Sequence, residues 1–165
     1  MKSSVKIRAI KENDLETIYN WNSPDSRGCF QEFTFESFKR LESEYQENGF
    51  IADKFKILIF EDDKNPLGLI YISVLRPGIF RLGLVVCEES YREKGIGTKV
   101  CGMITEHLFA NYPCVRIEAD TDIDNIPAQK VLEKSGFEKE GVLRKYRFHG
   151  GKWRDSLIYG IIRNI

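Results

Sequence analysis

A strand pattern gives way to a helix pattern at Tyr91-Arg92-Glu93-Lys94-Gly95-Ile96-Gly97-Thr98. Gly95 and Gly97 let the backbone curl without Cβ clashes, so that successive N–H groups can converge at the positive end of the helix dipole. A helix start of this kind binds anions, and a pyrophosphate fits there. The alternative interpretation is an ordinary glycine-containing helix start whose charged side chains are solvated.

Local charge supports anion binding at this segment. Arg92, Lys94 and Lys99 add positive charge to a chain in which 25 Lys and Arg balance 25 Asp and Glu. The segment lacks the GxxxxGK[ST] pattern of a nucleotide-binding P-loop, and Gly95-Ile96-Gly97 lacks the third glycine of a dinucleotide fingerprint. Those two kinds of nucleotide site are therefore disfavoured.

The flanking segments predict a mixed α+β fold. Apolar runs separated by turns at Asp62–Pro66 and Pro77–Gly78 indicate an antiparallel meander, with strands at 54–60, 67–74 and 79–86. Apolar positions after Gly95 recur at helical spacing, and Val115-Arg116-Ile117 begins another strand. Strand, helix and strand in that order imply a parallel crossover near the middle of the chain.

The two ends of the chain complete this fold. Residues 5–9 alternate as a half-buried strand, and Asn13 can cap a helix that follows. After a predicted loop at 22–33, Thr34 can cap a second helix that ends at Gly49. Its apolar stripe is predicted to be core rather than a ligand box, and consists of Phe35, Phe38, Leu41 and Tyr45. A short helix from Pro127 to Gly136 precedes a closing hairpin that turns at 149–152.

Composition bounds the class of protein. A length of 165 residues with 42% hydrophobic content suits one domain, predicted to cover residues 1–165. A net charge of zero argues against nucleic acid as a partner. Met1–Arg8 lacks the apolar core of a signal peptide, and no later run is long enough to span a membrane, so we expect no membrane association. Unpaired cysteines indicate a cytoplasmic location.

The cysteines and histidines do not predict a metal site. The four cysteines form no CxxC pair, and neither histidine lies at ligand spacing from them. His149, beside two glycines in a predicted turn, is expected to be exposed and inert, and His107 to pack on the long helix. Cys87 follows a predicted strand and raises the alternative of a covalent cysteine intermediate, but no histidine lies at an activating spacing, which favours a reaction without one.

Two separated motifs resemble one known family. Arg92-Glu93-Lys94-Gly95-Ile96-Gly97 is similar to the [Q/R]-x-x-G-x-[G/A] pattern of the GNAT superfamily of N-acetyltransferases. Downstream, the chain resembles the ribosomal-protein (RimJ/RimL-type) and spermidine acetyltransferase branch over Asp124–Phe137, Glu140–Leu143 and Gly151–Asp155. The resemblance covers nearly the whole chain and is strongest from about Leu82 onward.

The resemblance implies a fold and a cosubstrate. The fold is a mixed, mostly antiparallel sheet of about seven strands flanked by helices, with a V-shaped split between the fourth and fifth strands. Acetyl-CoA would bind across the mouth of that split, without a metal. A backbone N–H near Val85 or Val86 could stabilise the developing oxyanion. The implied cofactor-binding residues are Leu84, Val85, Val86, Arg92, Glu93, Lys94, Gly95, Ile96, Gly97, Thr98 and Asn125.

Proton transfer needs groups near the split. Glu118 and Asp120 stand two apart on a predicted strand, point to the same face and are the candidate bases. Asp122 and Asp124 continue the acidic run and are interpreted as a solvated strand end and helix-capping acids. Many relatives carry a tyrosine or serine on the short helix as proton donor. Leu132 and Ala128 occupy those positions, which leaves as candidate acids Tyr146, Ser135 and Tyr91.

The resemblance implies acetyl transfer to a primary amine but does not choose the acceptor. A small molecule such as a polyamine, amino sugar or aminoglycoside-like antibiotic and a protein N-terminus both remain open. Five glutamates around the second helix could line an acidic pocket or form a solvated face: Glu32, Glu36, Glu42, Glu44 and Glu47. The alternative from another class is a catalytically silent CoA-binding module. The oligomeric state also stays open, with a homodimer as one option.

Overall fold

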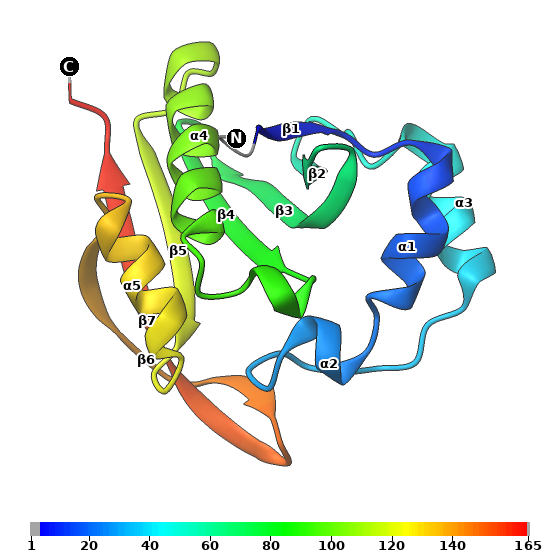
Figure 1. The fold of residues 1–165 in the computed structure, drawn as a ribbon. Helices are drawn as coiled ribbons and strands as arrows, with labels where there is room; N and C mark the ends of the chain where they lie inside the picture. Colours follow the sequence, from blue (N-terminus) through cyan, green and yellow to red (C-terminus); the bar gives the residue numbers. More distant parts are fainter. Residues whose placement is uncertain (1–3, 165) are drawn as a thin grey trace.

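The computed structural model describes residues 4–164. Its strands form one seven-stranded sheet in the order β1-β2-β3-β4-β5-β7-β6, flanked by helices (Figure 1). The strands are β1 Val5–Ala9, β2 Phe55–Asp62, β3 Asn65–Arg76, β4 Ile79–Val86, β5 Arg116–Asp122, β6 Glu138–His149 and β7 Lys152–Ile162. The α-helices are α1 Leu15–Asn20, α2 Pro24–Arg27, α3 Phe38–Asn48, α4 Ile96–Asn111 and α5 Ile126–Lys134, and 3-10 turns cover Glu12–Asp14 and Glu89–Tyr91.

The sheet splits between β4 and β5. All other neighbouring strands are antiparallel, whereas β4 and β5 run parallel and pair only from Ile79 opposite Arg116 to Arg81 opposite Glu118. Beyond those positions the two strands diverge, toward α2 and the tip of the β6–β7 hairpin in Figure 1. The predicted α+β fold and its V-shaped split are therefore confirmed.

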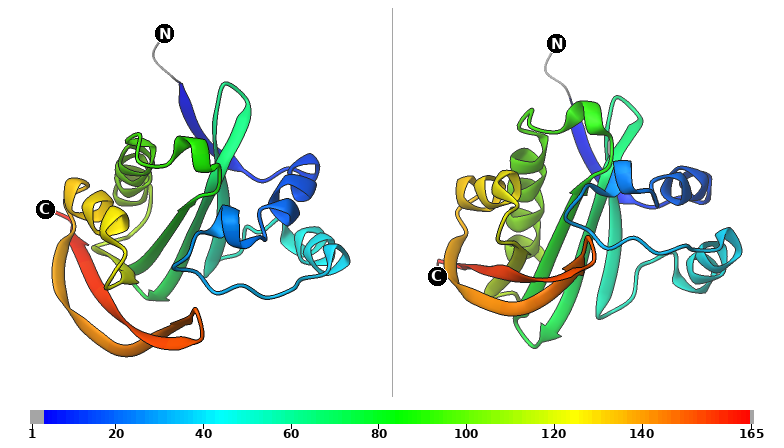
Figure 2. Two further views of the ribbon diagram at one scale, coloured as in Figure 1. Left: turned by 60° about the horizontal axis from the view of Figure 1, so that its bottom comes forward. Right: turned by 90° about the horizontal axis from the view of Figure 1, so that it is seen from below.

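Helices cover both faces of the sheet. Figure 2 shows α4 and α5 on one face and α1 and α3 on the other. A hydrophobic core lies on each face of the sheet, and alternate residues of β4 pack into one or the other. Leu82 and Leu84 pack into the core beneath α4 and α5, and Val85 packs into the second core with Trp21. Because side chains alternate along a strand, the split has an α4–α5 side and an α1–α3 side.

The N-terminal half departs from the predicted helices. Residues 22–33 contain the short helix α2. The Ser23 hydroxyl caps its first turn, and Pro24, whose fixed φ angle suits the first position of a helix, begins it. Helix α3 begins at Phe38 with Ser37, rather than Thr34, as its cap. Phe35 is therefore outside the helix and is 94% exposed, and Phe38 is 39% exposed, so the prediction of a core stripe was wrong for these two residues.

The closing hairpin turns where expected, but the prediction for His149 was wrong. Gly150 and Gly151 have φ values of 57° and 73°, the left-handed conformation that glycine adopts without strain. His149 is 7% exposed because it is the last residue of β6, where its ring turns inward against Asp122. His107, predicted to pack on the long helix, is exposed on α4, with its ring 6.0 Å from the ring of Tyr112.

Candidate active site

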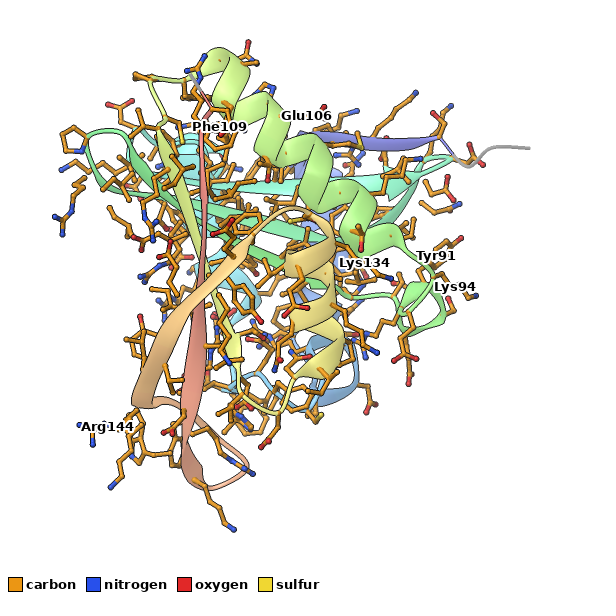
Figure 3. The ribbon with its side chains drawn as sticks, turned by 90° about the vertical axis from the view of Figure 1, so that its left-hand side faces the viewer. Tyr91, Lys94, Glu106, Phe109, Lys134 and Arg144 are labelled. Carbon is orange, nitrogen blue, oxygen red and sulfur yellow. The ribbon has the colours of Figure 1, made fainter. Side chains whose placement is uncertain are left out.

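The N-terminus of α4 presents uncapped backbone donors. Gly95 is the N-cap with φ 81°, and no side chain of the described residues caps this 16-residue helix. The first bond of the helix is from the Lys99 N–H to the Gly95 carbonyl, at 3.0 Å, so the N–H groups of Ile96, Gly97 and Thr98 have no intrahelical partner. Figure 3 shows Tyr91 and Lys94 beside this end of α4, and Glu106 and Phe109 toward the other.

Gly97 has a packing role that the sequence did not reveal. A Cβ at this position would lie 3.2 Å from Cγ2 of Val131 on α5, closer than side chains normally pack. The glycine therefore lets α4 and α5 approach. A larger residue here would push the two helices apart, so substitution of Gly97 is a poor test of anion binding.

Arg92 links α2 to the end of β4 through hydrogen bonds. Its Nε donates to the Val86 carbonyl at 3.0 Å, and its Nη2 donates to the carbonyls of Asp25 at 2.9 Å and Ser26 at 2.5 Å. The guanidinium is thus engaged with backbone oxygens rather than pointing freely at the helix start. Its expected contact with the cosubstrate stays a prediction.

The backbone of β4 faces the split at alternate residues. The Cys87 N–H donates to the Leu67 carbonyl of β3 at 2.8 Å. Because consecutive backbone groups of a strand point in opposite directions, those of Val86 and Leu84 point away from β3, toward the space that β5 leaves. Of the two N–H groups proposed for an oxyanion, this direction favours that of Val86 over that of Val85.

A row of three carboxylates lines β5 on the α1–α3 side of the split. Glu118, Asp120 and Asp122 alternate with Ile117, Ala119 and Thr121, which are buried on the opposite face. Glu118 lies 3.0 Å from Arg116 and 3.7 Å from Arg81, and Asp120 lies 2.6 Å from Arg147. Since arginine stabilises an ionised carboxylate and occupies its oxygens, these two residues are poorly arranged as bases.

The third carboxylate of the row was misassigned. Asp122 is 1% exposed, not a solvated strand end, and its Oδ2 contacts Nε2 of His149. Burial alone would raise the pKa of Asp122, but hydrogen bonds from His149 and from the Asp124 N–H hold the pKa below its usual value.

Two further candidates, Tyr146 and Asn125, make hydrogen bonds within the protein. The Tyr146 hydroxyl accepts a hydrogen bond from Arg81 at 3.3 Å, and its side chain is 42% exposed. Asn125 is the N-cap of α5, where its Oδ1 accepts from the Ala128 N–H at 3.2 Å. Neither arrangement excludes a contact with a ligand, so both assignments stay predictions.

Two surface hollows lie away from the split. One of about 220 Å³ is lined by Ser4, Lys6, Glu61, Asp63 and Lys64. Another, of about 510 Å³, lies between the second half of α4 and the end of β7. Neither includes a residue of the split or of the α4 start. Within residues 4–164 no group of three or more His, Cys, Asp or Glu side chains could hold a metal. None of the helices described is long and apolar enough to cross a membrane.

Residues 4–138 match the family described as the acetyltransferase (GNAT) domain. The chain belongs to the GNAT acetyltransferase family. The prophage-derived N-acetyltransferase YokL of Bacillus subtilis is 30% identical, over 97% of this chain and 90% of the relative. Aminoglycoside N(6')-acetyltransferase type 1 of Klebsiella pneumoniae is 23% identical, over 85% of this chain and 77% of the relative.

A solved structure confirms the GNAT fold. Spermidine N-acetyltransferase from Vibrio cholerae, in complex with CoA and spermine, matches with a TM-score of 0.86 and 22% identity, over 96% of this chain and 95% of that chain. This GNAT chain is an acyltransferase that uses acetyl-CoA to acetylate amines. The silent CoA-binding module is correspondingly disfavoured.

The prediction of direct transfer leads to a test at Cys87. Burial raises the pKa of the Cys87 thiol to about 12, so the nucleophilic thiolate is scarce at neutral pH. Cys87→Ala should therefore keep more than half of the wild-type turnover. Intact-protein mass spectrometry of the wild type with acetyl-CoA alone should detect no acetyl adduct. A stable adduct that disappears in Cys87→Ala would contradict direct transfer.

Sequence reasoning missed the pairing of Asp122 with His149. The adjacent glycines suggested an exposed turn, which hid the strand position of the histidine. A signal was present in the alternation: Arg147 and His149 stand two apart near the end of β6, as Asp120 and Asp122 do on β5. Matching the two rows needed the order of β5, β7 and β6 in the sheet, which sequence alone did not supply.

Proposed function

We propose that this GNAT chain, as one domain over residues 1–165, transfers acetyl directly from acetyl-CoA to a primary amine of a small molecule. One observation carries the proposal: the uncapped N-terminus of α4 is the first α-helix start after β4, beyond the 3-10 turn Glu89–Tyr91, at the end where β4 parts from β5. An anion-binding helix start and a strand with free backbone groups are what a long, phosphorylated thioester needs.

The residues present fit acetyl-CoA. The N–H groups of Ile96, Gly97 and Thr98 would hold the pyrophosphate, and the backbone of Leu84 would bond the pantetheine arm, since the Val86 carbonyl already accepts a hydrogen bond from Arg92. Bound acetyl-CoA supplies the reactive thioester. The Val86 N–H would then donate to the carbonyl oxygen as negative charge develops on it, which lowers the barrier to attack by the amine.

The acceptor would approach from the α1–α3 side of the split. Tyr71 is half-buried there, and burial raises its pKa, so it is a neutral aromatic surface at physiological pH. Glu36 is close enough to influence Tyr71 electrostatically, while the five glutamates around α3 are all exposed. Acidic and aromatic groups favour a cationic amine. Relatives named for aminoglycoside and spermidine acetylation support a small-molecule amine over a protein N-terminus.

A turnover panel tests the proposal. Thiol release from acetyl-CoA would be measured with spermidine, an aminoglycoside, glucosamine and short peptides, and the products identified by mass spectrometry. Acetylation of one of the small amines at a rate at least tenfold above the peptides supports the proposal. Turnover confined to the peptides would favour the protein N-terminus instead, and CoA binding without any turnover would favour the silent module. Size-exclusion chromatography during purification would test the homodimer, which remains a prediction.

A further inference from the structure

The pair formed by Asp122 and His149 is a buried dyad that the proposed chemistry has not used. Asp122 is 1% exposed and His149 is 7% exposed. The Asp124 N–H donates to Oδ1 of Asp122 at 2.8 Å, while Oδ2 faces Nε2 of the imidazole. The ring of Phe30 packs edge-on against the imidazole, with centroids 6.0 Å apart. Both side chains of the dyad are thus held in one orientation.

The dyad lies level with the proposed reaction centre. The last paired positions of the parallel strands are Arg81 and Glu118, and Asp122 is as far beyond Glu118 as Val85 is beyond Arg81. Across the split, Asp122 therefore faces the stretch of β4 that carries the Val86 N–H. Its side chain is on the α1–α3 side, together with Phe30 from the loop after α2. This is the side from which the acceptor would approach.

Hydrogen bonding fixes the tautomer of His149. An ionised Asp122 can only accept, so Nε2 carries the proton and the neutral imidazole keeps its lone pair on Nδ1. Among the described residues no hydrogen bond involves Nδ1, and Nδ1 is not one of the fully buried polar atoms that lack a partner. Nδ1 therefore reaches the accessible surface as a proton acceptor.

We propose that His149 is a catalytic base of this enzyme, taking a proton from the acceptor amine on Nδ1, and that Asp122 is its positioning residue. This role rests on the proposed function. The ammonium R–NH₃⁺ gives one proton to Nδ1, leaving R–NH₂ and an imidazolium. The amine lone pair forms the C–N bond, and the C–S bond breaks. The thiolate takes a second proton from that nitrogen, giving R–NH–acetyl and CoA–SH. His149 then releases its proton to water.

Charged groups from three strands surround the dyad, and some of them influence the pKa of Asp122. Asp122 and the nearby ion pair of Asp120 and Arg147 lie on the β5 and β6 sides. From β7, Arg154 acts on Asp122 and lies 3.3 Å from Asp124. The lowered pKa of Asp122 means that its carboxylate stays ionised as pH falls until well below neutrality, so Asp122 keeps its role as hydrogen-bond acceptor for His149 at neutral pH.

Kinetics of His149→Gln test the role, with spermidine and an aminoglycoside as acceptors. Glutamine can still hydrogen-bond to Asp122 but cannot accept the proton. We expect kcat at pH 7 to fall roughly 100-fold or more, with affinity for CoA unchanged within about twofold. The pH profile of this variant should differ from that of the wild type, because turnover should follow only the fraction of the acceptor that is already a free amine. Asp122→Asn should lower kcat and change the pH profile as well.

Nuclear magnetic resonance gives a readout independent of turnover. The wild type should show a far-downfield imidazole N–H proton, protected from exchange, from Nε2 of His149. That signal should be absent from His149→Gln and Asp122→Asn. It should remain in His107→Gln, the matched control at the other of the two histidines, which is exposed on α4.

The outcomes separate this role from the function on which it rests. No turnover by the wild type with any amine of the panel overturns the proposed function and this role together. A wild type that turns over, beside a folded His149→Gln with similar kcat and an unchanged pH profile, overturns the role alone. Calorimetric binding of CoA shows that the variant is folded. If His149→Gln does not bind CoA, His149→Asn is measured in its place.

Discussion

Thr98→Asp is expected to weaken the binding of acetyl-CoA about thirtyfold without loss of stability. Thr98 is the third residue of α4, and Cβ atoms of a helix tilt toward its N-terminus, so the new carboxylate lies beside the uncapped N–H groups. It would compete for those donors and repel the pyrophosphate. Two charges about 8 Å apart at an effective dielectric constant of about 20 cost about 2 kcal/mol, which corresponds to that loss in affinity.

The melting temperature of Thr98→Asp distinguishes an electrostatic loss of affinity from a loss of structure. An acidic residue in the first turn stabilises a helix by roughly 0.3–1 kcal/mol, so the melting temperature should stay level or rise. Thr98→Asn is the neutral control of the same size and should bind acetyl-CoA within about threefold of the wild type. Acetyl-pantetheine, which lacks the pyrophosphate, should react equally well with both variants. If Thr98→Asp weakened the reaction with acetyl-pantetheine as much as that with acetyl-CoA, the pyrophosphate would not lie at the start of α4.

Gly68→Ala is expected to be the most destabilising of the small substitutions in the sheet. Gly68 is buried on β3, and a Cβ there would lie 2.0 Å from the Val85 carbonyl and 2.5 Å from the Phe60 ring. Backbone would have to move, which should lower the free energy of unfolding by about 3 kcal/mol. For a domain of this size that corresponds to a drop in melting temperature of roughly 6–12 °C. The strand displaced is β4, so CoA affinity should fall as well.

Gly83→Ala is the matched control, since it places the same methyl group on the neighbouring strand. A Cβ at Gly83 would lie 3.5 Å from Cβ of Tyr71, an ordinary packing distance. Its effect on the free energy of unfolding should be below about 0.5 kcal/mol, since an alanine also reduces the entropy of the unfolded chain. Thermal denaturation of both variants measures the difference. Similar melting temperatures would show that the approach of β3 and β4 at Gly68 is looser than described.

Local signals predicted the elements that we propose to hold acetyl-CoA. The end of β4 at Val86 and the start of α4 after Gly95 follow from an apolar run and from glycine chemistry, both of which act within a few residues. The crossover followed because strand, helix and strand in sequence restrict the topology. In contrast, helix α2 covers only Pro24–Arg27, and a helix of one turn has no periodicity to detect.

Contacts between distant segments could not be predicted. The partners of Glu118, Asp120 and Asp122 come from β4, β6 and β5 itself, so these ion pairs depend on strand order and register. The sequence placed Glu118 and Asp120 on one face correctly, but it did not reveal the arginines that neutralise them. His149 was wrongly predicted to be exposed, because the glycines next to it indicated a turn and not the end of a strand.

Backbone amide resonances recorded during titration with CoA test the central claim most directly, namely that the split and the α4 start hold the cosubstrate. The account predicts large shifts at Leu84, Val86, Ile96, Gly97 and Thr98, with slower hydrogen exchange at the uncapped donors of α4. Amides around the hollow near the end of β7, such as that of Ile162, should not change. The opposite pattern, with shifts at Ile162 and none at Ile96 to Thr98, would contradict it.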